Sequence, residues 1–408
     1  MRTLFVLSFC SALTFGLENG LARTPPMGWM SWTRFFCETN CAHNPFSCIN
    51  EYLYKSQADR LALDGYKDVG YDRVHIDDCW AELKRDENGK MVADKSRFPS
   101  GMNGLANYVH KLGLKLGSYG DYGTKTCAGY LGSQNFEKID AFTFAEWEID
   151  YVKLDGCNAD ASDYPKGYPL FGRYLNQTGR PIVYSCSWPA YIHDKKSIDY
   201  DTIVKNCNLW RNYDDISSSW ESLHGIISVY IRDQDQLIPI HGPGHWNDPD
   251  MLIVGNPGVS IGAARVQMAV WSIWSAPLIM SNDLRIIGED FAALLKNEKV
   301  IAVDQDELGI MGRMVKKTDQ LYYFVKPMTP YVKGEKNRYS YALAVVNYSN
   351  APATFRFTLD NFGISDAKGY SVEDLFLRKP LGHYTKDTVI NEAISPRDAF
   401  FIKATIVK

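Results

Sequence analysis

The chain has 408 residues and a formal net charge of −4, with 44 Lys and Arg against 48 Asp and Glu. This length suffices for one large domain and a smaller one, and the lack of a basic surplus argues against a nucleic-acid-binding protein. Aromatic residues make up 13% of the sequence. That proportion suits a site in which rings stack on sugars, although large cores also use aromatic side chains.

The first 16 residues are typical of a signal peptide. Arg2 precedes an apolar run from Leu4 to Leu13, and small residues follow near Gly16. The run is too short to cross a bilayer, and no later run reaches the length of a membrane helix. We therefore expect residues 1–16 to be removed and the rest to be a soluble protein of the secretory pathway.

From Met27 to about Ile301, strand-like runs alternate with helix-like ones. The strand-like runs are 73–77, 114–119, 151–155, 182–185, 208–210 and 251–254, and clear helical windows are 101–112, 134–148, 163–176 and 260–275. Such alternation predicts a parallel sheet with helical crossovers. About eight units fit a (β/α)8 TIM barrel, which usually needs about 250 residues. The predicted fold class is α/β, with the barrel over residues 17–307.

After Leu308 the pattern changes to the alternation of antiparallel strands. The predicted strands are 322–326, 341–347, 354–358, 369–374 and 399–407, with turns at Gly334, Asn350 and Gly363. They predict a C-terminal antiparallel β-sandwich over residues 308–408. No acidic motif follows these strands, so catalysis is expected in the barrel.

Cysteines and sequons both fit a secreted chain. Eight of the nine cysteines lie outside the predicted signal peptide, and an even number in an oxidising compartment predicts disulfides. Zinc is the less favoured alternative, because the chain has no C-x-x-C spacing. Sequons at Asn176 and Asn347 predict N-glycosylation, and therefore surface positions.

Polar clusters follow five of the predicted strands. They are Asp77, Asp78 and Trp80; Tyr119 and Asp121; Lys153 and Asp155; the run Ser185–Tyr191; and the run Arg211–Asp215. A single polar cluster at a strand end could be a structural Lys–Asp pair. In a TIM barrel, however, the active site lies at the carboxyl ends of the strands, and all five clusters would meet there. We therefore predict one acidic, aromatic mouth. Because the chain has no Gly-rich phosphate loop, the mouth suits a neutral, polyhydroxylated ligand.

Two carboxylates from different strands suit cleavage of a glycosidic bond, one as nucleophile and the other as acid/base. Asp155 is the better nucleophile, because nearby Lys153 would hold it ionised. Asp215 is the candidate acid/base, because Tyr213 and Asp214 could raise its pKa. From spacing alone this division of roles is a hypothesis.

The run His241-Gly-Pro-Gly-His245, with Asp248, contains the residue types of a metal site. The Gly-Pro-Gly segment cannot form a helix that would aim both imidazoles at one ion. We expect a loop near the mouth and no bound metal.

Six runs carry a resemblance to a known family. They are Thr24–Trp29 (TPPMGW), Ile76–Trp80 (IDDCW), Lys153–Cys157 (KLDGC), Cys186–Pro189 (CSWP), Trp210–Asp215 (WRNYDD) and Gly242–Asp250 (GPGHWNDPD). The sequence resembles the lysosomal α-galactosidase and α-N-acetylgalactosaminidase glycoside hydrolases (family 27, clan D). The resemblance implies a homodimer without a metal or organic cofactor, and lysosomal delivery with secretion as the alternative.

The resemblance also implies residue roles. It implies a retaining double displacement with Asp155 as nucleophile and Asp215 as acid/base, their carboxyls about 5–5.5 Å apart. The implied substrate-binding residues are Trp32, Asp77, Asp78, Tyr119, Lys153, Ser187, Ala190, Tyr191 and Arg211. Asp77 and Asp78 would accept hydrogen bonds from sugar hydroxyls, and Arg211 would lie on the side of the C2 substituent. The implied disulfides are Cys37–Cys79, Cys41–Cys48, Cys127–Cys157 and Cys186–Cys207.

Two residues bear on specificity. α-Galactosidases that this sequence resembles carry Glu and Leu where this chain has Ser187 and Ala190, and those larger side chains would exclude an N-acetyl group. Ser187 could hydrogen-bond the amide and Ala190 could pack against its methyl group. A roomy pocket rejects the smaller galactose only weakly, by roughly 1–3 kcal/mol per missing apolar contact. We therefore predict cleavage of terminal α-linked N-acetylgalactosamine from glycolipids, glycopeptides or oligosaccharides, with weaker α-galactosidase activity.

The sequence departs from the family pattern at two positions, and two alternative functions remain open. His75 stands where the family pattern has Asn, and Gly120 where it has Ala; both adjoin binding positions and could tune the pocket. One alternative is an α-galactosidase with relaxed specificity at C2. The other is a catalytically silent sugar-binding protein, which would be expected to lack Asp155 or Asp215.

Overall fold

The computed structural model describes residues 17, 19–334 and 338–407. Residues 1–16, the predicted signal peptide, lie outside the described residues. Within the described part of the chain, no helix is long and apolar enough to cross a membrane.

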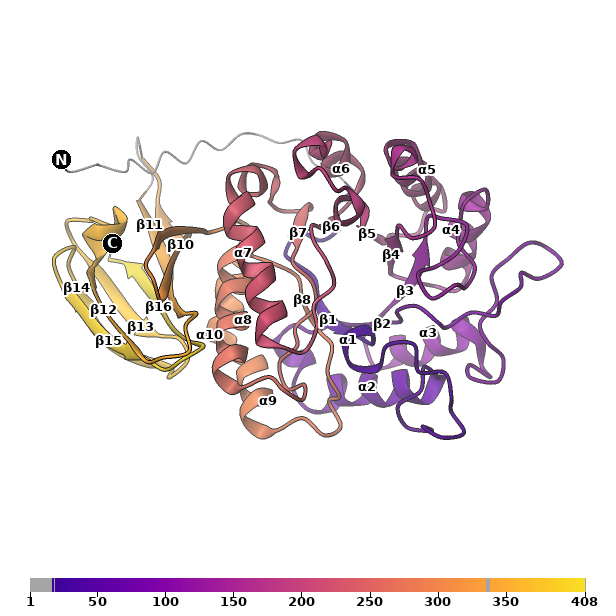
Figure 1. Cartoon of the computed structure of the whole chain (residues 1–408), viewed down its shortest axis with the longest axis horizontal. Helices are drawn as coiled ribbons and strands as arrows, with labels where there is room; N and C mark the ends of the chain where they lie inside the picture. The colour runs from indigo at the N-terminus through magenta and orange to yellow at the C-terminus, as the bar shows by residue number, and fades with distance from the viewer. Residues whose placement is uncertain (1–16, 18, 335–337, 408) are drawn as a thin grey trace.

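Eight parallel strands curl into a barrel (Figure 1). They are β1 (Met27–Met30), β2 (Arg73–His75), β3 (Lys115–Asp121), β4 (Tyr151–Asp155), β5 (Val183–Cys186), β6 (Leu209–Arg211), β7 (Trp246–Asp248) and β8 (Leu278–Met280). The sheet runs β7-β6-β5-β4-β3-β2-β1-β8. Its two ends meet at Leu252, whose N–H donates to the Ile279 carbonyl at 2.7 Å and whose carbonyl accepts from the Ser281 N–H at 2.9 Å.

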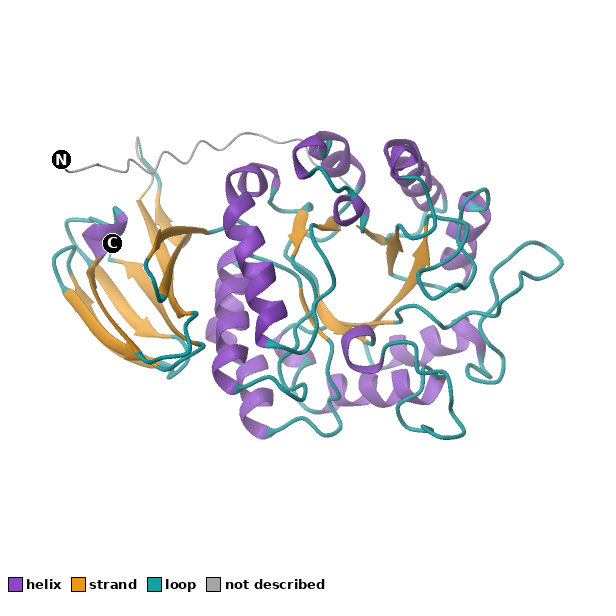
Figure 2. Ribbon diagram, viewed as in Figure 1, coloured by secondary structure: helices purple, strands orange, loops and turns teal. Residues whose placement is uncertain are grey.

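Helices surround the barrel (Figure 2). They are α1 (Trp32–Phe35), α2 (Glu51–Leu63), α3 (Gly101–Lys111), α4 (Glu137–Glu146), α5 (Tyr164–Gln177), α6 (Tyr200–Asn206), α7 (Trp220–Leu237), α8 (Ile261–Trp274), α9 (Glu289–Leu295) and α10 (Glu298–Asp304). Several begin at a capping side chain: Asn50 accepts from the Leu53 N–H, and Ser260 from the Ala263 N–H. Helix α8 is buried around almost its whole circumference, because it lies between the barrel and the C-terminal sheets.

The C-terminal part consists of antiparallel strands. A six-stranded sheet, in the order β14-β13-β16-β11-β10-β9, faces a two-stranded sheet of β12 and β15. The bounds are β9 (Arg313–Lys317), β10 (Leu321–Val332), β11 (Arg338–Asn347), β12 (Ala353–Thr358), β13 (Tyr370–Asp374), β14 (Lys379–Tyr384), β15 (Val389–Ile394) and β16 (Asp398–Ile406). Its apolar core is separate from that of the barrel. The predicted fold class is therefore confirmed, and we propose the boundary between the two parts at residues 307 and 308.

The structure corrects one predicted strand. Residues 251–254 form only an isolated bridge, Leu252 to Met280, and the preceding strand is β7 at Trp246–Asp248. Strands β1, β7 and β8 have three or four residues each, which is too short for an apolar alternation to identify them. In the sandwich, β14 and β15 are mostly exposed, and β15 buries only Ile390 and Ile394, so neither shows the regular apolar alternation that marks a strand.

The two sequons differ in exposure. Asn176 lies on the exposed side of α5. Asn347 is fully buried, and its side-chain amide donates to the backbone carbonyls of Ala351, Ile394 and Ser395 at 2.8, 3.3 and 3.0 Å. The prediction that Asn347 is a surface position is wrong, because this amide joins β11 to the loop after β15. A glycan on the amide nitrogen would break these hydrogen bonds.

The structure contains four disulfides, with the pairing that the resemblance implies. They are Cys37–Cys79, Cys41–Cys48, Cys127–Cys157 and Cys186–Cys207. Cys37–Cys79 and Cys127–Cys157 join loops at the carboxyl ends of neighbouring strands, whereas Cys186–Cys207 ties the end of β5 to the segment before β6. The first two therefore hold together the rim on which the predicted site residues stand.

Candidate active site

A buried ion pair lies at the centre of the barrel mouth. Residues 151, 153 and 155 alternate with outward-facing neighbours, so Lys153 and Asp155 project from the same side of β4. The Lys153 Nζ lies 2.8 Å from the Asp77 Oδ2, and both side chains are buried. Burial alone would lower the pKa of Lys153, but Asp77, Asp155 and Asp215 outweigh it and raise that pKa. Burial raises the pKa of Asp77, and Lys153 offsets part of that rise.

Two tyrosines hold Asp155 in place. The Tyr119 hydroxyl donates to Oδ2 at 2.9 Å, and the Tyr191 hydroxyl donates to Oδ1 at 2.6 Å. Both oxygens of the carboxylate are therefore oriented from neighbouring barrel strands. The direct partner of Lys153 is Asp77, and the charge of Lys153 also interacts with Asp155. That Lys153 keeps Asp155 ionised stays a prediction.

Asp215 stands at the rim, with 60% of its side chain exposed. Its Oδ1 accepts from Arg211 Nη2 at 3.1 Å, and its Oδ2 accepts from Trp32 Nε1 at 3.2 Å. Burial alone would raise the pKa of Asp215, but the charges of Arg211 and Lys153 outweigh it and lower that pKa. The predicted rise is therefore wrong, because the residues that face Asp215 are cations and hydrogen-bond donors, whereas the sequence neighbours Tyr213 and Asp214 are not its contacts.

Asp250 is a site residue to which the sequence analysis assigned no role. Its Oδ1 lies 3.0 Å from Arg211 Nη1, and its Oδ2 accepts from the Ile216 N–H at 2.7 Å. Burial raises the pKa of Asp250 to about 7 against the pull of Arg211. Asp250 thus orients the guanidinium that in turn contacts Asp215. The only sequence signal was a second acidic residue two positions after Asp248 at the end of β7.

Asp78 is fixed by the backbone of two loops. Its carboxylate accepts from the Cys79 N–H at 2.6 Å and from the Ala128 N–H at 3.0 Å. Burial raises its pKa to about 6, despite these hydrogen bonds. Asp77 and Asp78 are both about 2% exposed, so they present their carboxyls from a rigid strand end.

Ser187 and Ala190 lie on a short turn after β5. The Ser187 N–H donates to the Leu154 carbonyl at 3.0 Å, and the Ala190 N–H donates back to the Ser187 carbonyl at 3.1 Å. A 3-10 turn, Trp188–Tyr191, follows, and its last residue carries the hydroxyl that contacts Asp155. The turn that carries Ser187 and Ala190 therefore reaches Asp155 through Tyr191.

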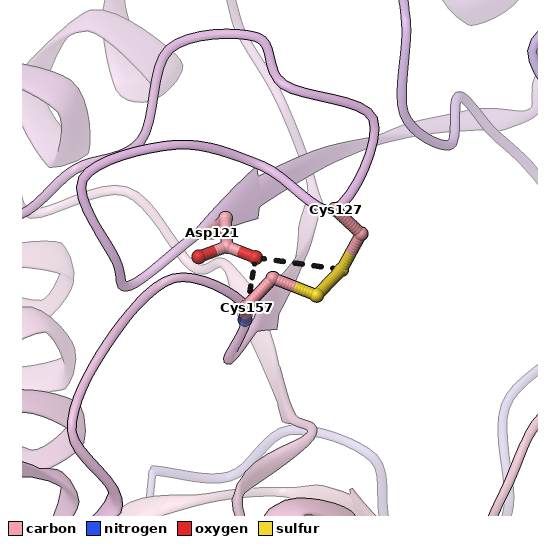
Figure 3. A group of neighbouring side chains, drawn as sticks. All are labelled: Asp121, Cys127 and Cys157. Carbon is pink, nitrogen blue, oxygen red and sulfur yellow. Dashed lines mark hydrogen bonds between the residues drawn. A yellow bond between two sulfur atoms is a disulfide. The ribbon is translucent and has the colours of Figure 1, made fainter.

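Asp121, Cys127 and Cys157 form a cluster with metal-ligand atoms (Figure 3). Both cysteines are joined in a disulfide and offer no thiolate. Asp121 instead accepts from the Gly123 and Cys157 N–H groups, at 2.7 and 3.0 Å. Burial and then the charge of Asp155 raise the pKa of Asp121 to about 8. A protonated Asp121 lets a second carboxyl lie close to Asp155 without like-charge repulsion.

The two histidines of the Gly-Pro-Gly run have separate contacts. His241 Nδ1 accepts from the Asn247 N–H at 3.2 Å, and His245 Nδ1 lies 2.9 Å from the Ile240 carbonyl. Gly242 and His245 close a tight turn between them. The run is therefore a structural loop before the amino end of β7, and the expectation that it lies near the mouth is wrong, because the mouth is at the carboxyl ends of the strands.

His75 and Gly120 differ in what they face. His75 is buried inside the barrel, where its ring stacks on Tyr151 with centroids 3.9 Å apart. Burial and then Arg73 and Lys153 hold its pKa well below the usual range, so it is a neutral ring. Gly120 faces outward toward Leu154 and Phe144 in the helix layer, away from the mouth.

The barrel mouth thus combines paired carboxyls, aromatic side chains and buried cations, as in sugar-cleaving TIM barrels. Comparison with known proteins agrees: the family described as alpha galactosidase A (Melibiase_2) matches residues 24–306. The chain is 47% identical to an alpha-N-acetylgalactosaminidase of Gallus gallus, covering 89% of both chains. It is 40% identical to the alpha-galactosidase A of Homo sapiens, covering 97% of this chain and 92% of the other.

Solved structures give the same result. The alpha-galactosidase I of Mortierella vinacea superposes with a TM-score of 0.83 at 29% identity, covering 95% of this chain and 98% of the other. The fold and the site define the class of glycoside hydrolases. Within that class, the chain belongs to the alpha galactosidase A family.

Proposed function

We propose that this glycoside hydrolase is a retaining exo-glycosidase that removes terminal α-linked N-acetylgalactosamine, with weaker α-galactosidase activity. The observation that carries the proposal is the pair of small side chains, Ser187 and Ala190, on the turn beside Asp155. They leave space for an acetamido group at C2, which Glu and Leu would occupy. The alpha-N-acetylgalactosaminidases among the relatives support the same choice.

In the first step, ionised Asp155 attacks the anomeric carbon and forms a glycosyl ester. The bond from that carbon to the leaving oxygen breaks, and Asp215 gives its proton to this oxygen. The hydrogen bonds from Tyr119 and Tyr191 support the role of Asp155, because they aim its carboxylate oxygens. As the ester forms, the hydrogen bond to the carboxylate oxygen that attacks the sugar must weaken.

In the second step, ionised Asp215 takes a proton from water, and the water oxygen attacks the anomeric carbon. The ester bond breaks and returns Asp155 as a carboxylate, so two inversions give net retention. The lowered pKa of Asp215 suits its role as a base here. The same lowered pKa requires acidic conditions for its role as an acid in the first step.

The remaining binding residues are assigned by their chemistry. Asp77, held by Lys153, and Asp78, held by backbone N–H groups, accept hydrogen bonds from the sugar hydroxyls. Arg211 lies between Asp215 and Asp250 and faces the side of the C2 substituent. Trp32 and Tyr191 supply the aromatic walls.

Three further features belong to the proposal. The need for a protonated Asp215 fits the acidic lumen of the lysosome, with secretion as the alternative destination. The enzyme forms a homodimer, as the resemblance implies. Asn176, exposed on α5, carries a glycan.

The test is kcat/KM on an aryl α-N-acetylgalactosaminide and an aryl α-galactoside, measured side by side at acidic pH. A clear preference for the acetamido sugar supports the proposal. A preference for the galactoside would be compatible with the proposed mechanism but would contradict the proposed specificity. If neither substrate is cleaved, the alternative of a catalytically silent sugar-binding protein replaces the proposed function.

A further inference from the structure

Phe36 is an exposed aromatic residue in a strained backbone conformation. It follows α1 with φ 46° and ψ −135°, and 54% of the residue is exposed. A bulky side chain at positive φ is uncommon and costs on the order of 1–3 kcal/mol. Phe36 occupies the second position of a turn that the Glu38 N–H closes on the Phe35 carbonyl at 3.2 Å, and its dihedral angles are those of a type II′ turn, where glycine is the usual residue. Strain of this kind concentrates where a site needs a side chain in a fixed place.

The surroundings of Phe36 fix its position. Its N–H donates to the Trp32 carbonyl at 2.7 Å, and the next residue, Cys37, is bonded to Cys79. Cys79 directly follows Asp78, so the disulfide joins Phe36 to the strand end that holds the proposed sugar-binding carboxyls. The Phe36 ring packs edge-on against Trp32, with centroids 5.8 Å apart.

Trp32 links Phe36 to the proposed acid/base. The Trp32 Nε1 donates to Asp215 Oδ2 at 3.2 Å. Because the acid/base delivers its proton to the leaving oxygen, groups beyond Asp215 face the leaving group rather than the cleaved sugar. Phe36 therefore lies one aromatic ring beyond the proposed acid/base.

A groove continues from Phe36. It has a volume of about 460 Å³ and is lined by Arg34, Phe35, Phe36, Cys37, Glu38, Asn44 and Ser47. Within it, Asn44 Nδ2 donates to Glu38 Oε2 at 2.8 Å, and the Asn40 N–H donates to Glu38 Oε1 at 2.7 Å. The groove thus combines one exposed ring with charged and amide groups whose positions are already set.

We propose that Phe36 and this groove form a leaving-group subsite for sugar residues, so that the preferred substrate carries its terminal sugar on an oligosaccharide. The inference rests on the proposed function. A pyranose stacks one face on an aromatic ring and directs its hydroxyls to polar partners, and the groove offers both. A lipid chain would need a continuous apolar surface, which Arg34, Glu38, Asn44 and Ser47 interrupt.

The experiment compares three substrates at acidic pH: an α-N-acetylgalactosaminyl oligosaccharide, the methyl α-glycoside and an α-N-acetylgalactosaminyl threonine peptide. For Phe36→Ala we expect kcat/KM on the oligosaccharide to fall about tenfold, with the methyl glycoside unchanged. Phe36→Tyr, which keeps the ring, should retain the parent value. Phe46→Ala is the matched control, because Phe46 is 65% exposed in the same segment but does not line the groove.

Each other outcome overturns the inference. An equal loss on the oligosaccharide and the methyl glycoside would mean that Phe36 supports the catalytic site. No loss on either would mean that the ring touches no leaving group. A loss confined to the peptide would assign the groove to a peptide. If the parent enzyme cleaves none of the three substrates, the proposed function itself fails, which is a different result from any of these.

Discussion

Among the residues that the structure describes, two lysines are buried, one at the barrel mouth and one where the barrel meets the sandwich, and their surroundings differ. Lys153 faces the carboxylates Asp77, Asp155 and Asp215, and its pKa is raised. Lys326, on β10, donates to the carbonyls of Ser272 and Val303 and to the Ser275 hydroxyl. Burial lowers its pKa to about 8, although Asp304 and Asp306 partly offset this.

The contrast separates a functional charge from a structural one. Ser272 and Val303 lie in the last turns of α8 and α10, so the Lys326 ammonium caps the carboxyl ends of two barrel helices and binds the sandwich to them. Lys153 instead faces a set of acids that we propose to bind and cleave the substrate. The following predictions test this difference, beginning with the chemistry that the charged mouth is proposed to perform.

The largest effect is expected from Asp155→Asn. The substitution removes the attacking carboxylate and leaves a side chain of the same shape between Tyr119 and Tyr191. We expect kcat to fall at least about 10⁴-fold, with an unchanged circular dichroism spectrum. Retention of more than a few per cent of the activity would contradict the nucleophile assignment.

Lys153→Met should destabilise the fold more than Lys326→Met does. The first change leaves Asp77 as a buried, unpaired acid, at a cost of about 3–5 kcal/mol. The second leaves neutral carbonyls without a donor, at a cost of about 1–3 kcal/mol. Urea unfolding at pH 7 measures both free energies, and a larger loss for Lys326→Met would reverse the comparison.

Lys326 also predicts a pH dependence of stability. Its pKa is about 8 in the folded protein and 10.5 as the reference value, so between these values the unfolded chain binds more protons than the folded one. The contribution of this group to the free energy of unfolding should therefore rise with pH across that window, by up to about 3 kcal/mol. The measurement is the difference between the parent and Lys326→Met at pH 7.5 and pH 10. A constant difference would show that the ammonium stays charged throughout.

The smallest effect concerns the acid/base. Trp32→Phe keeps an aromatic ring but removes the hydrogen bond that helps to lower the pKa of Asp215. Because the first step needs protonated Asp215, kcat/KM should fall at high pH, and the variant should shift this fall to higher pH by about 0.5 unit. An unchanged profile would mean that Arg211 and Lys153 alone set this pKa.

Much of the site could be predicted because its residues end β3 and β4, the two longest strands of the barrel. Lys153 and Asp155 end β4, and Tyr119 and Asp121 lie near the end of β3, so alternation alone brings them to one edge. The role of Asp250 could not be predicted in this way, since it depends on a contact with Arg211, which lies on the neighbouring strand. The same holds for the contact of Asp215 with Trp32, which follows the distant strand β1. Its other partner, Arg211, lies only four residues earlier in the chain. Asn347 is buried because its amide hydrogen-bonds residues 394 and 395, which are far away in the sequence, and a three-residue sequon gives no sign of this contact.

The central claim is that Ser187 and Ala190 select the acetamido sugar. The most direct test measures the ratio of kcat/KM for aryl α-N-acetylgalactosaminide and aryl α-galactoside in the parent enzyme and in Ser187→Glu/Ala190→Leu. We predict that the parent prefers the acetamido sugar and that the double variant prefers galactose, because the larger side chains fill the space at C2. If the double variant stays active and keeps the parent's ratio, these two residues do not determine specificity.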